Sequence, residues 1–484
     1  MTGDAYAAAR PPRPEHMILL VNPYFLRDDA KQLERMKPYP PLATLLCAAA
    51  LRDRGHEVTL FDATLAESIE AFHAALAAAR PSVVAIVEDS FNFVTKMCTV
   101  RLREATLEMI DAARRRDCRV VVHGSDATDH PMRYLHAGAD AVLLGEPEAT
   151  LGELAAAWSS DASASIASVA GLARRGADGE LDVTPPRTGS RDLDALPLPA
   201  WDLIDAEDYR RAWVRAHGRL SWNVATSRGC PYGCNWCAKP VFGRRYAQRS
   251  PASVAEELRR LKFEVGVDHV WFADDLFGLT ARWIGELADE IHARDARIPF
   301  MIQCRADLLS PNVARALARA GCEEVWMGVE SGSQRILDAM DKGTTVDEVL
   351  AATGALQSQG IRACWFLQLG YPGEQWDDLV ATRDLVRRAR PDDVGVSVAY
   401  PLPGTKFHAA VREQLGARTN WEETGDLAML FQGTYTTPFY RRLRDALHAE
   451  VASGGVDAER WFALAEEEGA HRSARPTEIA DAAR

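Results

Sequence analysis

Three cysteines in the middle of the chain constrain its fold and chemistry more than any other feature. Cys230, Cys234 and Cys237 occupy the loop Gly229–Cys237, which follows the strand-like run Trp222–Thr226. Glycine and proline between the cysteines permit a tight loop, so that all three sulfurs can bind one inorganic centre. Such a centre lacks a fourth protein ligand, which on a 4Fe-4S cluster leaves one iron open to a small molecule.

A structural zinc site is the alternative for these thiols, and it requires four protein ligands. No fourth cysteine lies near the loop, and the closest histidines, His217 and His269, lack the spacing of a zinc finger. We therefore favour the iron–sulfur interpretation, with Cys230, Cys234 and Cys237 as the metal ligands.

The composition is that of an ordinary soluble globular protein. The chain has 484 residues, of which 47% are hydrophobic and 26% charged. This length is enough for roughly two to four domains. The formal net charge of −13 argues against a broad nucleic-acid-binding surface, so no nucleic-acid partner is expected.

The cysteine usage and the absence of long apolar runs indicate a cytoplasmic protein. Apart from the central three, the nine cysteines form no disulfide-scaffold pattern, which fits a reducing compartment. No apolar run has transmembrane length, so no membrane span is expected. Residues 1–16 have no apolar signal region and are predicted to be a flexible N-terminus.

A first alternation of strands and helices covers residues 17–160. Apolar runs predict five buried parallel strands, at Met17–Val21, Val58–Phe61, Val83–Val87, Val120–Val122 and Ala141–Leu144. This βαβ series predicts an α/β domain with a doubly wound parallel sheet. Ligands of such sheets bind at the carboxyl ends of the strands.

A second alternation covers residues 216–410. It predicts six βα units, with strands at Trp222–Thr226, His269–Ala273, Phe300–Cys304, Glu324–Val329, Cys364–Leu369 and Gly395–Ala399. Six units predict a partial (β/α)6 barrel, whose chemistry lies at the carboxyl ends of its strands. The cysteine loop follows the first of these strands.

Two further segments complete the chain. Residues 161–215 are rich in turn-forming residues and are predicted to be a linker, with one hairpin around Gly176–Gly179. Residues 411–484 are predicted to be a small helical C-terminal region that contains the amphipathic helix Phe439–His448.

The chain resembles a known family in both of its strand–helix regions, residues 17–160 and 216–410. The loop CxxxCxxC, with Trp236 before its last cysteine, resembles the cluster loop of the radical S-adenosylmethionine (SAM) enzymes. Residues 17–160 resemble the cobalamin-binding domain of one subfamily, which includes class B radical SAM methyltransferases. The features that carry this second resemblance are Asn22-Pro23, Pro40–Leu42, Arg54–Val58 and Gly138–Glu146. The chain lacks the DxHxxG motif, and the resemblance implies cobalamin binding without a histidine below the metal.

The resemblance implies that SAM binds the open iron and is held from the strand ends of the barrel. The expected SAM contacts are Asp274, Asp275, Arg305, Glu330, Ser331 and Gly370. An oxygen of the acidic pair is expected to accept from the SAM amino group, and Arg305 to bind its carboxylate. Glu330 is expected to accept from the ribose hydroxyls or to pair with the methionyl end. A helix cap for the acids and a surface ion pair for Arg305 are the alternatives.

The same resemblance implies cobalamin at the carboxyl edge of the first sheet. The expected contacts are Asn22, Ser90, Gly124, Ser125, Gly145 and Glu146. His123 and His130 lie near this edge and are interpreted as hydrogen-bonding loop residues. The alternative is a domain of this ancestry that has lost cobalamin or that orients the substrate.

A radical reaction follows from the resemblance. The reduced cluster passes an electron to SAM, a 5′-deoxyadenosyl radical takes a hydrogen atom from an unactivated carbon, and methylcobalamin supplies a methyl group. C-methylation of a small-molecule substrate is the leading interpretation, with a flavodoxin- or ferredoxin-type protein as reductant. The alternatives are a cobalamin-associated radical cyclase or oxidative rearrangement enzyme without methyl transfer, and a cobalamin-dependent sensor. No catalytic side chain is assigned.

Overall fold

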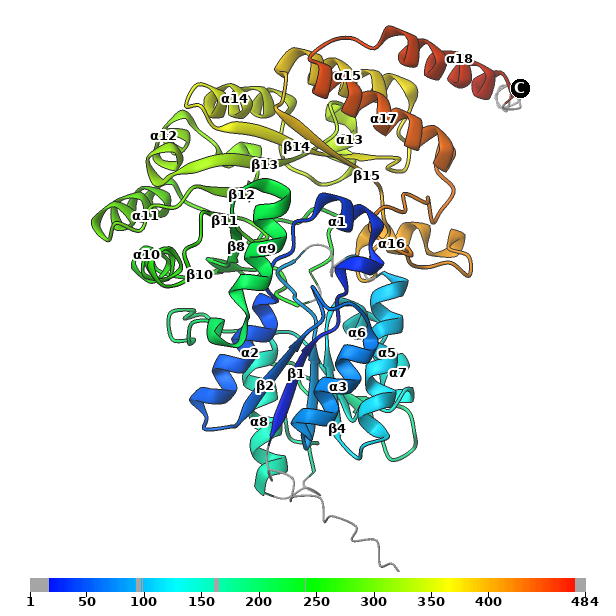
Figure 1. Cartoon of the computed structure of the whole chain (residues 1–484). Coiled ribbons are helices and arrows are strands. Elements are labelled where there is room, and N and C mark those ends of the chain that lie inside the picture. Colours follow the sequence, from blue (N-terminus) through cyan, green and yellow to red (C-terminus); the bar gives the residue numbers. More distant parts are fainter. Residues whose placement is uncertain (1–16, 93–96, 98, 161–164, 240, 475–484) are drawn as a thin grey trace, which may run out of the picture. The chain divides into compact units, whose positions relative to one another are not determined.

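The computed structural model describes residues 17–92, 97, 99–160, 165–239 and 241–474 (Figure 1). Residues 1–16, expected to be flexible, lie outside this described part. The chain divides into two compact units. Unit 1 holds residues 1–223, 240–243 and 422–425, and unit 2 holds residues 224–239, 244–421 and 426–484.

Unit 1 is built on a seven-stranded sheet with the order β2-β1-β3-β4-β5-β6-β7. The five expected strands form its parallel part: β1 (Ile18–Asn22), β2 (Val58–Asp62), β3 (Val83–Val87), β4 (Arg119–His123) and β5 (Ala141–Leu143). The strand order reverses between β1 and β3, which is where ligands of doubly wound sheets bind. The hairpin β6 (Leu172–Arg175) and β7 (Leu181–Val183) extends the sheet with two antiparallel strands.

Helices cover both faces of this sheet because its central strands are apolar on both faces. On one face, α3 (Ile69–Ala79), α5 (Val100–Arg114) and α7 (Pro131–His136) share a core with β1, β3 and β4. On the other face, α2 (Leu42–Asp53) packs against α8 (Pro147–Ser160) (Figure 1). The other α-helices of unit 1 are α1 (Ala30–Arg35), α6 (Ser125–Asp129) and α9 (Ala206–His217).

Unit 2 is organised around a six-stranded sheet with the order β15-β14-β13-β12-β11-β8. Its strands are β8 (Ser221–Val224), within which the unit boundary falls, β11 (His269–Phe272), β12 (Phe300–Cys304), β13 (Cys322–Glu330), β14 (Arg362–Leu369) and β15 (Asp393–Val398). Neighbouring strands from β11 to β15 run parallel. The predicted combination of a doubly wound sheet and a partial (β/α)6 barrel is confirmed.

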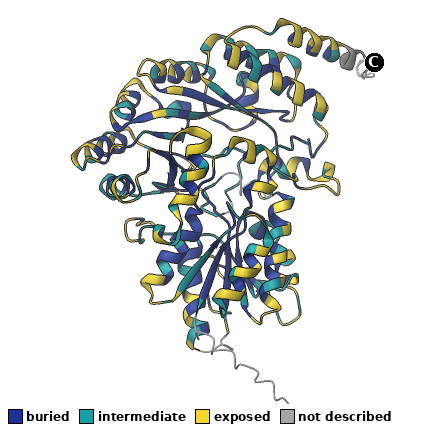
Figure 2. Ribbon diagram, viewed as in Figure 1, coloured by how far each residue is buried: buried dark blue, intermediate teal, exposed yellow. Residues whose placement is uncertain are grey.

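The helices of unit 2 follow the strands in turn: α10 (Pro251–Arg260), α11 (Ala281–Ala293), α12 (Pro311–Ala320), α13 (Gln334–Ala339), α14 (Val346–Gln357), α15 (Trp376–Ala389) and α16 (Lys406–Val411). Ser250 and Ser310 start α10 and α12, because each hydroxyl accepts from a backbone N–H of the first turn and a proline follows. Helix α17 (Thr437–Ser453) packs against β15, and α18 (Ala458–Ala474) follows. Figure 2 shows that the central strands of both sheets are buried, whereas the helices expose their outer faces.

No helix in the described part of the chain has the length and apolar character that a membrane crossing requires.

Candidate functional site

The three cysteines lie between two short strands, β9 (Ser227–Arg228) and β10 (Ala247–Gln248), which pair antiparallel. Cys234 is buried, while Cys230 and Cys237 are half-buried. Burial raises the pKa of Cys230 and raises that of Cys237 to about 11, and the Cys234 thiol raises both further. The thiols are therefore close enough to interact electrostatically, and iron binding must displace their protons.

Three thiols without a fourth protein ligand fit a 4Fe-4S cluster, in which three irons take a thiolate each and the fourth stays open. Within residues 17–92, 97, 99–160, 165–239 and 241–474, no three His, Cys, Asp or Glu side chains are arranged around a common metal ion. Sulfurs that share one zinc ion lie within about 4 Å of one another, because each Zn–S bond is about 2.3 Å. A 4Fe-4S cluster instead distributes its thiolates over separate irons and so accepts a wider spacing.

Asn235, between the second and third cysteines, holds the loop against the rest of unit 2. Its N–H donates to Met340 O at 3.0 Å and its Nδ2 donates to Ala339 O at 2.7 Å. The Tyr371 hydroxyl donates to Asn235 Oδ1 at 2.8 Å, and Trp236 packs against the apolar cluster that contains Tyr371. Sequence reasoning missed Asn235 and Tyr371, because their partners lie far away in the chain and no local pattern marks them.

Arg305, a predicted SAM contact, lies against the cysteine loop and is 6% exposed. Its Nη1 is 3.8 Å from Cys234 Sγ, and its guanidinium carbon is 3.7 Å from the centroid of the Tyr232 ring. Its Nε donates to Asp307 Oδ1 at 2.9 Å, and its Nη2 donates to Lys342 O at 2.9 Å. Arg305 thus forms an ion pair with Asp307 and lies beside the Cys234 sulfur. Its role as a SAM carboxylate ligand stays a prediction.

The two acids after β11 lie in different environments. Asp274 is buried and accepts from Thr226 N at 2.9 Å, Thr226 Oγ1 at 3.1 Å, Ser227 N at 2.5 Å and Ser227 Oγ at 2.7 Å. Burial raises the pKa of Asp274 to about 7, although these bonds oppose the shift. Asp275 is exposed and raises the pKa of Cys230 and Cys237 by its charge. Asp274 therefore joins the ends of β8 and β11, and Asp275 is the acid of the pair that a ligand can reach.

The end of β13 carries a buried ion pair that the sequence did not reveal. Lys342 Nζ donates to Glu330 Oε1 at 2.8 Å, and each side chain is 6% exposed. Glu330 has a φ of 64°, a left-handed conformation that is rare for a residue with a side chain and common at functional sites. A Cβ on Gly328 would lie 2.7 Å from Lys342 Nζ, so glycine is needed there. Ser331 is turned toward the chain itself, since its Oγ accepts from Ser333 N at 3.1 Å.

Gly370 terminates β14 in a crowded turn. Its φ is 79°, and a Cβ would lie 2.9 Å from Met429 Cε. Its N–H donates to Glu374 Oε2 at 2.6 Å, and burial raises the pKa of Glu374 to about 8. The order β11-β12-β13-β14 places Asp275, Arg305, Glu330 and Gly370 along one carboxyl edge of the sheet.

The carboxyl edge of the unit 1 sheet holds buried polar atoms without hydrogen-bond partners in the described part of the chain. These atoms include Ser90 Oγ and both carboxyl oxygens of Glu88, which is 1% exposed. Burial raises the pKa of Glu88 well above its usual range, and nearby Asp126 adds to this effect. A Cβ on Gly124 would lie 2.1 Å from Glu88 Oε2. Buried polar groups are normally hydrogen-bonded. A polar ligand such as a corrin, bound at this edge of the sheet, could supply the missing hydrogen bonds.

The other predicted cobalamin contacts divide into two groups. The Nδ2 of Asn22 donates to Asp62 Oδ1 and to Thr64 Oγ1, each at 3.0 Å, whereas its buried Oδ1 has no hydrogen-bond partner among the described residues. Glu146 likewise accepts from Ser190 N at 3.3 Å. Gly124, Ser125 and Gly145 lie directly at the ends of β4 and β5, next to Ser90 at the end of β3.

His123 and His130, the two histidines near this edge, each lie close to another polar group of the protein. His123 is fully buried, and its Nε2 lies 3.0 Å from Gly145 O. His130 Nε2 lies 4.0 Å from Asp126 Oδ1. His123 is therefore a hydrogen-bonding residue at the end of β4 and not in a loop, while the interpretation of His130 stays a prediction.

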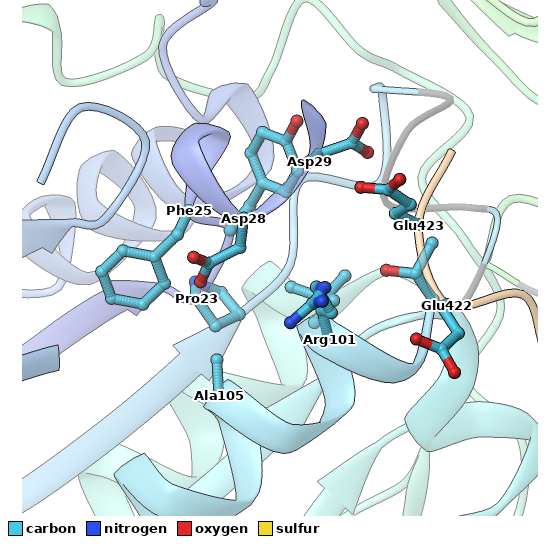
Figure 3. Close-up of a pocket in the computed structure, with 11 residues that line it drawn as sticks. Pro23, Phe25, Asp28, Asp29, Arg101, Ala105, Glu422 and Glu423 are labelled. Atoms are coloured by element: carbon cyan, nitrogen blue, oxygen red, sulfur yellow. The ribbon is translucent and has the colours of Figure 1, made fainter. Parts of the chain in front are cut away.

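A small pocket lies in unit 1 beside the end of β1 (Figure 3). It is lined by Pro23, Tyr24, Phe25, Asp28, Asp29, Thr99, Arg101, Leu102, Ala105, Glu422 and Glu423. Two of its acids have structural partners: Asp29 Oδ1 accepts from Thr424 Oγ1 at 2.7 Å, and Glu423 Oε2 accepts from Ala30 N at 3.0 Å. These bonds attach residues 422–425 to the start of α1, and we assign the pocket no ligand.

Comparisons with known proteins agree with both domains. The B12 binding domain family matches residues 34–155, and the Radical SAM superfamily matches residues 224–386. An uncharacterized methyltransferase of Pyrococcus horikoshii is 30% identical over 59% of this chain and 61% of its own length. The hopanoid C-3 methylase of Methylococcus capsulatus is 28% identical over 78% of this chain and 70% of its own length. The anaerobic magnesium-protoporphyrin IX monomethyl ester cyclase of Rubrivivax gelatinosus is 28% identical, and the chain spans 47% of its length.

A solved structure supports the fold. The radical SAM methyltransferase TsrM from Kitasatospora setae, determined with cobalamin and a 4Fe-4S cluster bound, superposes with a TM-score of 0.68. The match covers 84% of this chain and 76% of the TsrM chain at 24% identity. At this identity it supports the fold alone. Both domains and their order are thus accounted for: the chain carries a B12-binding domain followed by a radical SAM domain.

Proposed function

We propose that this enzyme transfers a methyl group from SAM to an unactivated carbon of a small molecule, using a 4Fe-4S cluster and cobalamin. One observation carries the proposal: a loop with three thiols and no fourth ligand occurs in the same chain as a sheet edge with unpartnered buried polar atoms. The methyltransferase and methylase relatives support methyl transfer over the cyclase alternative.

Cys230, Cys234 and Cys237 would hold the cluster. Arg305 lies beside the Cys234 sulfur, and Asn235 fixes the backbone between the second and third thiols. Asp275, Glu330 and Gly370 would contact SAM at the neighbouring strand ends. When bound, the cluster and SAM supply a radical that removes a hydrogen atom from the substrate.

Ser90, Gly124 and Gly145 would hold cobalamin in unit 1, which supplies the transferred methyl group when bound. Glycines at the ends of β4 and β5 allow a close approach of the backbone, and Ser90 Oγ offers a buried hydrogen-bonding group. His123 is directed at Gly145 O, so this chain provides no histidine for cobalt at that position.

The substrate class, the electron donor and the compartment are part of the same proposal. We infer a small-molecule substrate, a flavodoxin- or ferredoxin-type reductant and a cytoplasmic location. The absence of a membrane-crossing helix in the described part of the chain is consistent with this inference.

Product analysis tests the proposal. Anaerobically reconstituted protein with cobalamin, dithionite and SAM carrying a deuterated methyl group should yield both S-adenosylhomocysteine and 5′-deoxyadenosine. A radical cyclase or rearrangement enzyme would yield 5′-deoxyadenosine without S-adenosylhomocysteine. Reconstituted protein without iron–sulfur absorbance would instead support the cobalamin-dependent sensor.

A further inference from the structure

The stretch that contains the cysteine loop is positively charged within an acidic chain. The whole chain has 56 basic and 69 acidic residues, yet from Tyr209 to Ala255 it carries nine arginines and lysines and no aspartate or glutamate. The nine are Arg210, Arg211, Arg215, Arg219, Arg228, Lys239, Arg244, Arg245 and Arg249. Within unit 2, where the cysteine loop lies, the stretch contributes Arg228, Lys239, Arg244, Arg245 and Arg249, whereas Arg210 and Arg211 in α9 of unit 1 pair with Glu207 and Asp208.

Two of these cations in unit 2 are exposed and have no acidic partner among the residues that the structure describes. Arg244 and Arg245 follow the cysteine loop, and neither makes an ion pair or hydrogen bond there, in contrast to Arg249, which pairs with the buried Glu257. Arg244 lies against the loop, since a Cβ on Gly233 would be 3.7 Å from its Nη1. Lys239 Nζ donates to Tyr232 O at 3.3 Å. We call Lys239, Arg244 and Arg245 the basic rim.

The cysteine loop is accessible beside the basic rim. Pro231 is exposed, and Tyr232 and Gly233 are half-buried, whereas Cys234 behind them is buried. The outer edge of the loop, Pro231–Gly233, thus reaches solvent next to Lys239 and Arg244. A partner placed on this edge lies close to the thiols without touching them.

We propose that the basic rim docks an acidic one-electron donor protein over the cysteine loop. This inference rests on the proposed function, in which each SAM cleavage consumes one electron: the donor is oxidised by one electron and the cluster is reduced by one. Unpaired cations beside the loop give a charge-complementary surface for such a donor. Steering of this kind raises association rates by about 10- to 1,000-fold at low ionic strength.

Stopped-flow reduction of the reconstituted full-length enzyme tests the proposal. The absorbance of the cluster is followed after mixing with an acidic flavodoxin in its hydroquinone form and, separately, with dithionite. Reversing two charges in the variant Arg244→Glu/Arg245→Glu should slow reduction by flavodoxin by about 10-fold at low salt and flatten its salt dependence. Reduction by dithionite should change by less than about 2-fold, because a small reductant needs no docking surface.

Two controls define the outcomes. The variant Arg244→Lys/Arg245→Lys should keep the fast reaction, and Arg388→Glu, an exposed arginine on α15, should leave both reactions unchanged. Equal rates with flavodoxin in wild type and the charge-reversed variant would overturn the docking surface. So would an equal loss with both reductants, which would mean damage to the cluster. A wild-type protein that forms no cluster would refute the proposed function itself.

Discussion

The two ligand edges of this molecule differ in how complete they are without a ligand. Along the unit 2 edge, most polar side chains are bonded to the protein: Asp274 accepts four hydrogen bonds, Arg305 pairs with Asp307, and Glu330 pairs with Lys342. The exceptions there are Gln368 Oε1 and Glu374 Oε1, which have no hydrogen-bond partner among the described residues. Along the unit 1 edge, the side-chain oxygens of Glu88 and Ser90 are buried, and none of them has a hydrogen-bond partner within the described residues.

This difference indicates two ways of building a cofactor site. The unit 2 edge is preorganised by hydrogen bonds within the protein. These bonds fix the cysteine loop, and the three thiols are left to bind iron. The unit 1 edge leaves polar atoms for the ligand to satisfy. Substitutions in unit 2 should therefore damage the fold or the cluster, whereas substitutions in unit 1 should act mainly on ligand binding and on pH dependence.

The largest effect is expected at the cluster. Cys234→Ala should lower SAM cleavage by at least about 100-fold, more than the loss of outer-shell support alone causes at metal sites. The far-UV circular dichroism of the variant should match that of wild type, because the loop is held by Asn235 and not by the thiol. Cys364→Ala, in the buried interior of β14, should keep its iron content. Unfolding of Cys234→Ala would favour a structural metal.

The next effect tests the preorganised edge. Lys342→Met leaves the Glu330 carboxylate buried and unpaired, which should lower the free energy of unfolding by about 3–5 kcal/mol. The double variant Lys342→Met/Glu330→Gln should recover most of this loss in the free energy of unfolding, measured by urea denaturation. The exposed pair of Lys406 and Asp341 offers a matched control, and Lys406→Met should cost no more than about 1 kcal/mol. Similar losses for the two lysines would contradict a preorganised edge.

A smaller effect tests the unit 1 edge. In Gly124→Ala, the new methyl group must displace the Glu88 carboxyl group, at a cost of about 1–3 kcal/mol. Gly354→Ala in α14, where nothing lies within 4 Å of the new Cβ, should instead stabilise the protein by about 0.5–1 kcal/mol. Thermal unfolding of both variants measures the difference. If Gly124→Ala is as stable as wild type, the close approach of Glu88 to Gly124 is wrong.

The smallest expected effect is a change in pH dependence. Because burial raises the pKa of Glu88, the folded state binds this proton more tightly than the unfolded state. The stability that Glu88 contributes is therefore full below its unfolded pKa of about 4.3 and is lost as the pH rises through the folded pKa. Glu88→Gln resembles the protonated acid and should gain about 1 kcal/mol relative to wild type between about pH 5 and about pH 8.

Urea denaturation across this pH range measures the change, with Glu104→Gln on the exposed side of α5 as the control. Parallel pH profiles for wild type and Glu88→Gln would show that the carboxyl group is ionised in the folded protein.

Much of the architecture could be predicted from the sequence, because its signals are local. Continuous apolar runs gave the strands, and the expected range Phe300–Cys304 matches β12 residue for residue. Serine followed by proline marked the start of α10. The three cysteines were found from spacing alone, and the order of the sheets explains why the predicted SAM contacts share one edge.

What could not be predicted depends on partners that are distant in the sequence. The spacing of Asp274 and Asp275 does not show that the first binds Thr226 and Ser227 while the second stays exposed. Nothing near Lys342 indicates that it pairs with Glu330, and nothing near Asn235 indicates its bond to Tyr371. The hairpin β6–β7 was expected, but its attachment to β5 requires the folded sheet.

Electron paramagnetic resonance of the reconstituted, dithionite-reduced protein tests the central claim most directly. A 4Fe-4S cluster held by Cys230, Cys234 and Cys237 with one open iron predicts a reduced-cluster spectrum that changes when SAM is added. No iron–sulfur signal, or a spectrum that SAM leaves unchanged, would contradict the account.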